Sequence, residues 1–250
     1  MKLPLRIAIL ECDTPLTNTK AKFGGYGGVF KQLLERAAET LKQPGLSATE
    51  GLELSFYDVV QSKSYPALDD IDAILITGSK HSAYLDDPWI LDLVEFVKTT
   101  LHQERVRIIG VCFGHQIVGR ALGQRVYLGD AGWEVSVTPI ELSEAGKALF
   151  QRPELSLYQM HRDIVYGCPS GVEQLGSTDG CSNQGMYQKD RLITVQGHPE
   201  FTKEIEEEIL HARHAAGIFP DGIYEDAIKR LPDHDQGVEV GKAFLRFLLN

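Results

Sequence analysis

A cysteine flanked by glycines is the feature of this chain that points most directly to chemistry. Residues 110–114 read Gly-Val-Cys-Phe-Gly and directly follow the apolar run over residues 106–109. A buried strand, a sharp turn and a helix in this order lift a thiol out of the backbone and aim the next N–H groups at the atom it attacks. Gly110 and Gly114 avoid side-chain collisions in the turn. The pattern predicts that Cys112 is a nucleophile whose thiolate the helix N-terminus favours.

A histidine and a carboxylate that could serve this thiol occur later, where residues 197–200 read Gly-His-Pro-Glu. His198 could take the thiol proton and return it to a leaving group, while Glu200 could hold the imidazole in the required tautomer. Taken singly, each motif has an ordinary structural interpretation. A cysteine after an apolar strand often lies in the core, and His-Pro-Glu often precedes a helix. Their joint occurrence favours catalysis.

The two motifs, with Gln116 four residues after the cysteine, resemble those of the class I (triad) glutamine amidotransferases. Residues 74–79, Ile-Leu-Ile-Thr-Gly-Ser, resemble the strand and turn that supply the oxyanion hole of that family. Residues 158–165, Tyr-Gln-Met-His-Arg-Asp-Ile-Val, resemble its His-x-Asp-x-Val substrate loop. The resemblance runs from about Arg6 to about Phe201 and covers most of the chain.

The resemblance implies a role for each matching residue. Cys112, His198 and Glu200 would form the triad, and the backbone N–H groups of Gly78 and Phe113 would bind the oxyanion. The remaining matches would surround the glutamyl part of the substrate: Gln116, Trp133, Glu134, His161, Arg162 and Asp163. For Trp133 an ordinary packed indole is an equal alternative, and His161 with Asp163 could form only a capped turn.

The implied reaction is hydrolysis of a γ-glutamyl amide, either glutamine or a γ-glutamyl peptide such as glutathione, through a thioester on Cys112. It needs no cofactor and no metal. Many glutaminase domains have Gly-Gly-Pro after the oxyanion strand, whereas residues 77–80 here read Thr-Gly-Ser-Lys, and no synthetase domain is expected after Asn250. In both respects the sequence resembles the stand-alone branch of the class I glutamine amidotransferases that includes GMP-synthase-like proteins and γ-glutamyl peptidases.

Two alternatives remain open. The chain could be a glutaminase subunit that delivers ammonia to a separate synthetase partner, or a non-catalytic regulatory protein with the same fold. The complete set of Cys112, His198 and Glu200 argues against the regulatory protein. Thiol proteins of the DJ-1/PfpI type have a related elbow but lack the late His-Pro-Glu motif, so the sequence fits them poorly.

Composition limits the class of protein. The 250 residues, 43% hydrophobic and 24% charged, are expected to form one globular domain over residues 1–250. A net charge of −10 argues against nucleic-acid partners. Apolar stretches are too short for a membrane span or a signal peptide. The four cysteines lack the Cys-x-x-Cys spacing of a metal or disulfide framework, so a reduced, cytoplasmic protein is expected.

Strands and helices alternate over the first half of the sequence. Strands are expected over 6–12, 52–59, 73–77 and 106–111, with helices over 29–41, 88–101 and 117–122. This order predicts an α/β fold with a doubly wound, mostly parallel sheet flanked by helices, of the flavodoxin-like type of the class I glutamine amidotransferases.

The second half predicts mainly strands, followed by C-terminal helices around 205–210 and 244–248. Strands over 124–141, 155–160, 172–175 and 192–196 would extend the sheet or form a small antiparallel layer. Residues 24–28, Gly-Gly-Tyr-Gly-Gly, lack the Lys-Ser/Thr of a phosphate-binding P-loop, and a flexible loop near the cleft is expected there. The candidate nucleophile, the Gly78 turn and this loop would all lie at the carboxyl edge of the sheet, where such folds bind ligands.

Overall fold

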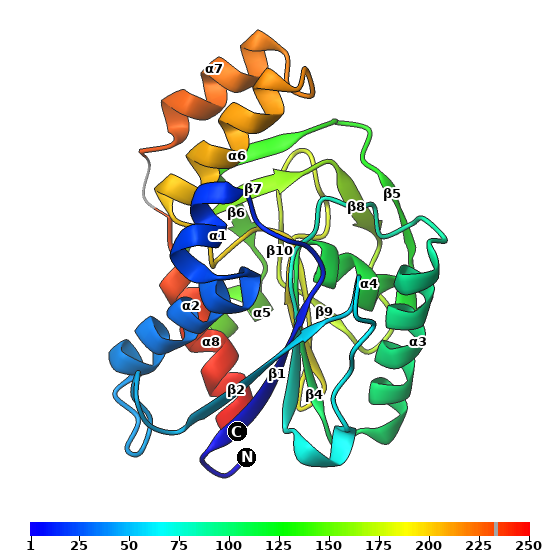
Figure 1. Cartoon of the computed structure of the whole chain (residues 1–250), viewed down its shortest axis with the longest axis vertical. Coiled ribbons are helices and arrows are strands. Elements are labelled where there is room, and N and C mark those ends of the chain that lie inside the picture. The colour runs from blue at the N-terminus through cyan, green and yellow to red at the C-terminus, as the bar shows by residue number, and fades with distance from the viewer. Residues whose placement is uncertain (233–234) are drawn as a thin grey trace.

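A seven-stranded sheet forms the centre of the protein in a computed structural model that describes residues 1–232 and 235–250 (Figure 1). The strand order is β2-β1-β3-β4-β12-β11-β9. The first five strands are parallel, and β11 and β9 complete the sheet in antiparallel pairs. This arrangement confirms the predicted mostly parallel sheet. The strands are β1 Leu5–Glu11, β2 Leu52–Asp58, β3 Ala73–Ile76, β4 Arg107–Val111, β9 Glu173–Gln174, β11 Gly185–Gln188 and β12 Leu192–Val195.

Helices cover both faces of the sheet, as the alternating residues of β1 illustrate. Ile7 and Ile9 join a core cluster with α2, α5 and α8, whereas Ala8 and Leu10 join a second cluster with α3 and α4. Successive strand residues point to opposite faces, so each face carries its own apolar core. The helices are α1 Thr17–Phe23, α2 Tyr26–Leu41, α3 Pro88–Gln103, α4 Phe113–Ala121, α5 Glu144–Phe150 and α8 Gly237–Leu249, with a 3-10 turn, η1, at Leu68–Asp70.

Two small antiparallel sheets and two further helices lie beyond the carboxyl edge of the main sheet (Figure 1). One sheet has the order β10-β6-β7 and the other pairs β5 with β8. Helices α6 and α7 pack on this layer through a third apolar cluster that includes Tyr158, Phe201 and Phe219. The elements are β5 Arg125–Leu128, β6 Glu134–Leu142, β7 Leu155–His161, β8 Asp163–Tyr166, β10 Gly176–Ser177, α6 Lys203–Ala215 and α7 Asp221–Arg230.

The glycine-rich segment over residues 24–28 does not form the flexible loop expected from sequence. Helix α1 ends before Gly24, whose φ is 80°, and α2 begins at Tyr26, so Gly27 and Gly28 are helical. A Cβ at Gly28 would lie 2.0 Å from the Phe23 carbonyl oxygen, and one at Gly27 would lie 2.3 Å from the Phe56 ring. The expectation was wrong because these glycines permit close packing rather than flexibility.

Over the described parts of the chain, every helix is too short or too polar to cross a bilayer. All four cysteines lie within those parts and are free.

The tight contact around the elbow glycines gives a stability prediction. A Cβ at Gly114 would lie 2.3 Å from the Ile76 carbonyl oxygen, which belongs to a buried strand that cannot shift cheaply. Gly114→Ala is therefore expected to lower the free energy of unfolding by about 2 to 3 kcal/mol, measured by denaturant titration. Gly222→Ala in α7 is the matched control because its Cβ would enter open space. Equal stability of the two variants would contradict the packing argument.

Candidate active site

The predicted elbow is present, and its apex has an uncommon backbone conformation. Cys112 lies between β4 and α4 with φ 51° and ψ −104°. Its N–H donates to the Val195 carbonyl of β12 at 2.9 Å, and its carbonyl accepts from the Gln116 N–H at 3.1 Å. A positive φ in a residue with a Cβ costs about 1 to 3 kcal/mol and persists only where neighbouring structure enforces it. The side chain is thereby presented to a pocket at the carboxyl edge of the sheet.

His198 reaches the same pocket from the chain that follows β12. Its backbone N–H donates to the Tyr158 carbonyl at 2.8 Å, which fixes the segment against β7. Its Nδ1 lies 2.8 Å from Glu200 Oε1, and its ring stacks on Phe201 with centroids 4.0 Å apart. Because Glu200 occupies Nδ1, the other ring nitrogen, Nε2, is left for a group in the pocket.

The charge state of His198 depends on its two acidic neighbours. Burial by itself lowers the pKa of the imidazole, but a Cys112 thiolate and the Glu200 carboxylate outweigh it and raise the pKa well above the ordinary value. A charged His198 is thus favoured in the folded protein. Its contribution to stability is present below the unfolded pKa of about 6.5 and is lost as pH rises through the folded pKa.

The two residues predicted to supply the oxyanion hole, Phe113 and Gly78, both lie beside Cys112. Phe113 is the first residue of α4, so its N–H has no partner within the helix. Its ring packs away from the pocket against Trp89, with centroids 5.5 Å apart. On the opposite side, a Cβ at Gly78 would lie 2.8 Å from His198 Cε1 and 3.7 Å from Cys112 Cβ. A residue with a side chain at position 78 would therefore intrude between these two groups.

Gln116 lies on the pocket wall, held by a buried polar network. Its Nε2 donates to the Asp163 carbonyl at 2.9 Å and to Gln196 Oε1 at 3.1 Å. These bonds fix the amide plane and leave Gln116 Oε1 as the free acceptor of the side chain. The network joins α4 to β8 and to the end of β12, and so ties one wall of the pocket to the sheet.

The residues around position 161 form the junction of two strands rather than only a capped turn. His161 ends β7 and Asp163 begins β8. His161 Nε2 lies 3.0 Å from Glu134 Oε2, and Thr178 and Gln184 also donate to this carboxylate. Burial would raise the pKa of Glu134, but these partners, His161 foremost, hold it below its ordinary value. Glu134, which does not line the pocket, thus holds the His161 ring in position through Nε2.

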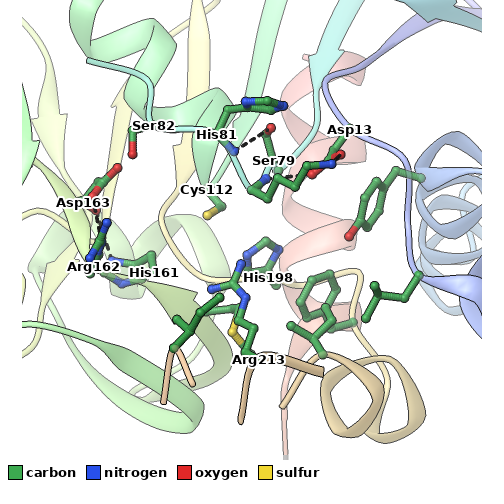
Figure 2. A pocket seen from close by; sticks show the side chains of 18 of the residues that line it. Asp13, Ser79, His81, Ser82, Cys112, His161, Arg162, Asp163, His198 and Arg213 are labelled. Carbon is green, nitrogen blue, oxygen red and sulfur yellow. Dashed lines mark hydrogen bonds and ion pairs between the residues drawn. The ribbon is translucent and has the colours of Figure 1, made fainter. Parts of the chain in front are cut away.

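The pocket has a volume of about 630 Å³ and contains most of the predicted site residues (Figure 2). Glu200, Glu134 and the Phe113 ring lie outside its lining. In Figure 2, Arg162 and Asp163 lie on one side of Cys112 and Asp13 lies on the other. The predicted residues that line the pocket are Gly78, Cys112, Gln116, Trp133, His161, Arg162, Asp163 and His198.

Sequence reasoning missed several polar residues of this pocket, among them Asp13, Tyr26 and Arg213. Asp13 follows β1 and accepts from both Lys80 Nζ at 2.6 Å and the Lys80 backbone N–H at 2.8 Å, which fixes the turn after Gly78. Asp13 could have been predicted from its position in the sequence, because it follows a strand that ends at the same edge of the sheet as β4. The sequence indicated Arg213 less clearly. It lies four residues after Ile209, so both side chains lie on one face of the helix.

Arg213 approaches the pocket from the last turn of α6. Its guanidinium lies 4.9 Å from the centre of the Trp133 ring, and Arg162 lies 5.3 Å from the same ring. Trp133 also packs edge-on against Phe219, with centroids 5.1 Å apart. The indole therefore contacts two cations, each held by a cation–π interaction.

A second buried carboxyl group lies behind the histidine. Glu206 of α6 accepts from the Ser136 N–H at 2.9 Å, and burial raises its pKa to about 8 although His198 and Arg213 oppose the shift. At neutral pH this group is largely uncharged. It therefore does not supply a full negative charge to the cations around it.

Comparison with other proteins places these residues in a family. Residues 39–215 match the model of the family described as glutamine amidotransferase class-I. A glutamine amidotransferase-like protein of Schizosaccharomyces pombe is 37% identical over 97% of this chain and 98% of that protein. The chain therefore belongs to the class I glutamine amidotransferase family. Gamma-glutamyl peptidase 2 of Arabidopsis thaliana is a further relative, 29% identical over 96% of each chain.

Solved structures confirm the fold class. A glutamine amidotransferase from Methylobacillus flagellatus superposes with a TM-score of 0.72 at 20% identity, over 99% of this chain and 93% of that chain. One from Thermotoga maritima gives a TM-score of 0.69 at 19% identity, over 99% and 97% of the two chains.

The His198–Glu200 contact gives a prediction about ionisation. Glu200→Gln keeps a hydrogen-bond acceptor at Nδ1 but removes one of the two charges that raise the pKa of His198. The pKa should fall by about one unit or more, measured by NMR titration of histidine labelled in the imidazole ring. Glu207→Gln is the control, because that carboxylate faces the exposed His211 instead. An unchanged His198 titration in Glu200→Gln would show that the carboxylate orients the ring without charging it.

Proposed function

We propose that the protein hydrolyses a γ-glutamyl amide through a γ-glutamyl thioester on Cys112. The observation that carries this proposal is the convergence of two residues on one pocket. Cys112 has a strained backbone and lines the pocket, and His198 has its Nδ1 fixed by the buried Glu200 carboxylate. That combination is the arrangement of a nucleophile, a base and an orienting group. Membership of the glutamine amidotransferase family supports the choice of a γ-glutamyl carbonyl as the electrophile.

In the first half-reaction the proton of the Cys112 thiol already resides on His198, and the thiolate sulfur attacks the carbonyl carbon of the γ-amide. The Gly78 and Phe113 N–H groups lie where they could donate to the oxyanion that develops. The carbon–nitrogen bond then breaks, and the imidazolium gives its proton to the departing amine. The raised pKa of His198 suits it to donate this proton near neutral pH.

In the second half-reaction water attacks the thioester while His198 accepts one of its protons. The carbon–sulfur bond breaks, the sulfur departs as the thiolate beside the imidazolium, and glutamate is released. Glu200 keeps the same tautomer throughout by accepting from Nδ1. Gln116, Arg162 and Asp163 are assigned to the glutamyl moiety, where the Gln116 Oε1 and Asp163 carboxylate could accept from an α-amino group and Arg162 could contact an α-carboxylate.

The leaving amine decides between two activities of the same site. Similarity to γ-glutamyl peptidase 2 supports a peptide leaving group, whereas the amidotransferase relatives support ammonia and a synthetase partner that receives it. We favour the peptidase, because the pocket extends beyond the triad to Tyr26, Ile218 and Arg213, and ammonia would not fill that space.

Replacement of the nucleophile tests the proposal. Cys112→Ser is expected to abolish release of glutamate from both glutamine and γ-glutamyl-cysteinyl-glycine, because a serine hydroxyl is far less acidic than a thiol. Products are measured by mass spectrometry, and the thioester is sought on the intact wild-type protein. Cys168→Ser is the matched control, since that thiol lies away from the pocket and donates to the Val172 carbonyl. Retained turnover by Cys112→Ser would exclude the assignment.

A further inference from the structure

The Arg213 guanidinium has no hydrogen-bond or carboxylate partner within ion-pair distance in the parts of the chain that the structure describes. Its Nη1 atom is buried and has no hydrogen-bond partner among residues 1–232 and 235–250. Burial lowers the pKa of the guanidinium, although the Cys112 thiolate and Tyr26 counteract part of that effect. An arginine remains charged in spite of such a shift. A buried guanidinium nitrogen without a partner is costly, and Arg213 lines the pocket, so a ligand there could complete its contacts.

The acidic side chains near Arg213 are engaged elsewhere. Asp13 pairs with Lys80 at 2.6 Å, and Glu206 accepts from the Ser136 N–H while burial keeps it largely neutral at pH 7. By comparison, Arg162 lies 3.9 Å from the Asp163 carboxylate and is half exposed. Arg213 thus differs from the other two cations of the pocket, which each have an acidic neighbour.

The position of Arg213 also separates it from the residues assigned to the glutamyl moiety. Gln116, Arg162 and Asp163 come from α4 and the β7–β8 junction, whereas Arg213 extends from α6 toward Cys112 and His198 (Figure 2). Trp133 contacts both arginines by cation–π interactions. The pocket consequently has two cationic groups that come from different elements.

We propose that Arg213 binds a carboxylate on the leaving amine, which makes the preferred substrates γ-glutamyl peptides with a free C-terminal carboxyl group. A planar guanidinium matches a carboxylate through two parallel hydrogen bonds, and Trp133 holds it in place. The inference rests on the proposed function, because the thioester reaction defines which part of the substrate leaves. Arg213 is then a specificity residue, not a member of the catalytic triad.

The test compares two substrates that differ only in the terminal charge: γ-glutamyl-cysteinyl-glycine and its C-terminal amide. Wild-type protein should prefer the acid by about 10-fold or more in kcat/KM, as expected for a charge-assisted hydrogen bond. Arg213→Gln should reduce this preference to near unity, mainly by raising KM for the acid. Arg213→Lys, which keeps the charge without the planar fork, should retain part of it.

Lys203→Gln is the control, because it removes a cation from the exposed face of the same helix and should leave the preference unchanged. Circular dichroism and thermal unfolding establish that each variant folds. A wild-type protein that does not distinguish acid from amide would overturn the inference. An equal loss on both substrates in Arg213→Gln would also overturn it, because the guanidinium would then serve the thiolate or the glutamyl moiety.

Failure of the proposed function gives a different result. If wild-type protein hydrolyses neither substrate, calorimetry can measure binding of the acid and the amide to Cys112→Ser with Arg213 present or replaced by glutamine. Tighter binding of the acid that depends on Arg213 would support the carboxylate site without the hydrolytic activity. Equal binding of acid and amide, or binding of neither, would exclude the site.

Discussion

The positive φ of Cys112 is the constraint on which the site depends. The conformation is sterically costly for a residue with a Cβ, and three neighbouring elements enforce it. The Val195 carbonyl of β12 accepts from the Cys112 N–H, α4 begins at the next residue, and β4 lies at the centre of the sheet between β3 and β12. Local strain is thus sustained by the most buried part of the fold. A thiol on a peripheral loop would relax to an ordinary conformation and lose its fixed direction.

Hydrogen-bonded polar side chains in the pocket wall add to the constraint that the backbone of Cys112 imposes on the site. The carboxyl edge of a parallel sheet exposes backbone and side-chain polar groups, which must be satisfied when loops cover them. The Gln116 amide donates to Gln196 and to the Asp163 carbonyl, and the Glu134 carboxylate accepts from Thr178 and Gln184. These hydrogen bonds orient the pocket wall. Rigidity of the wall follows from the cost of breaking them.

Much of the fold and the centre of the site could be predicted from sequence because the signals are local. The elbow glycines surround the cysteine directly, and Glu200 reaches His198 across only two residues. The glycines of residues 24–28 were misjudged because their reason is tertiary: a close contact with Phe56 on β2 cannot be inferred from neighbours in sequence. Arg213 was missed for a similar reason, since only the folded chain places it beside Trp133. Helix α7 and β11 had no periodicity long enough to identify.

The two ends of the pocket are held by different interactions, and this difference determines which of their residues can be substituted. The end lined by Gln116 and Asp163 is held by hydrogen bonds that join α4, β8 and the end of β12, so substitution of Gln116 leaves buried polar groups without partners. The other end is lined by Tyr26, Ile218 and Arg213, and of these Tyr26 packs on the separate apolar cluster that includes Phe219. Side chains at that end can be replaced at small cost to the main core. Proteins of this fold could therefore keep one acyl-transfer chemistry while the leaving group they accept diverges, which is consistent with amidotransferases and γ-glutamyl peptidases among the relatives of this chain.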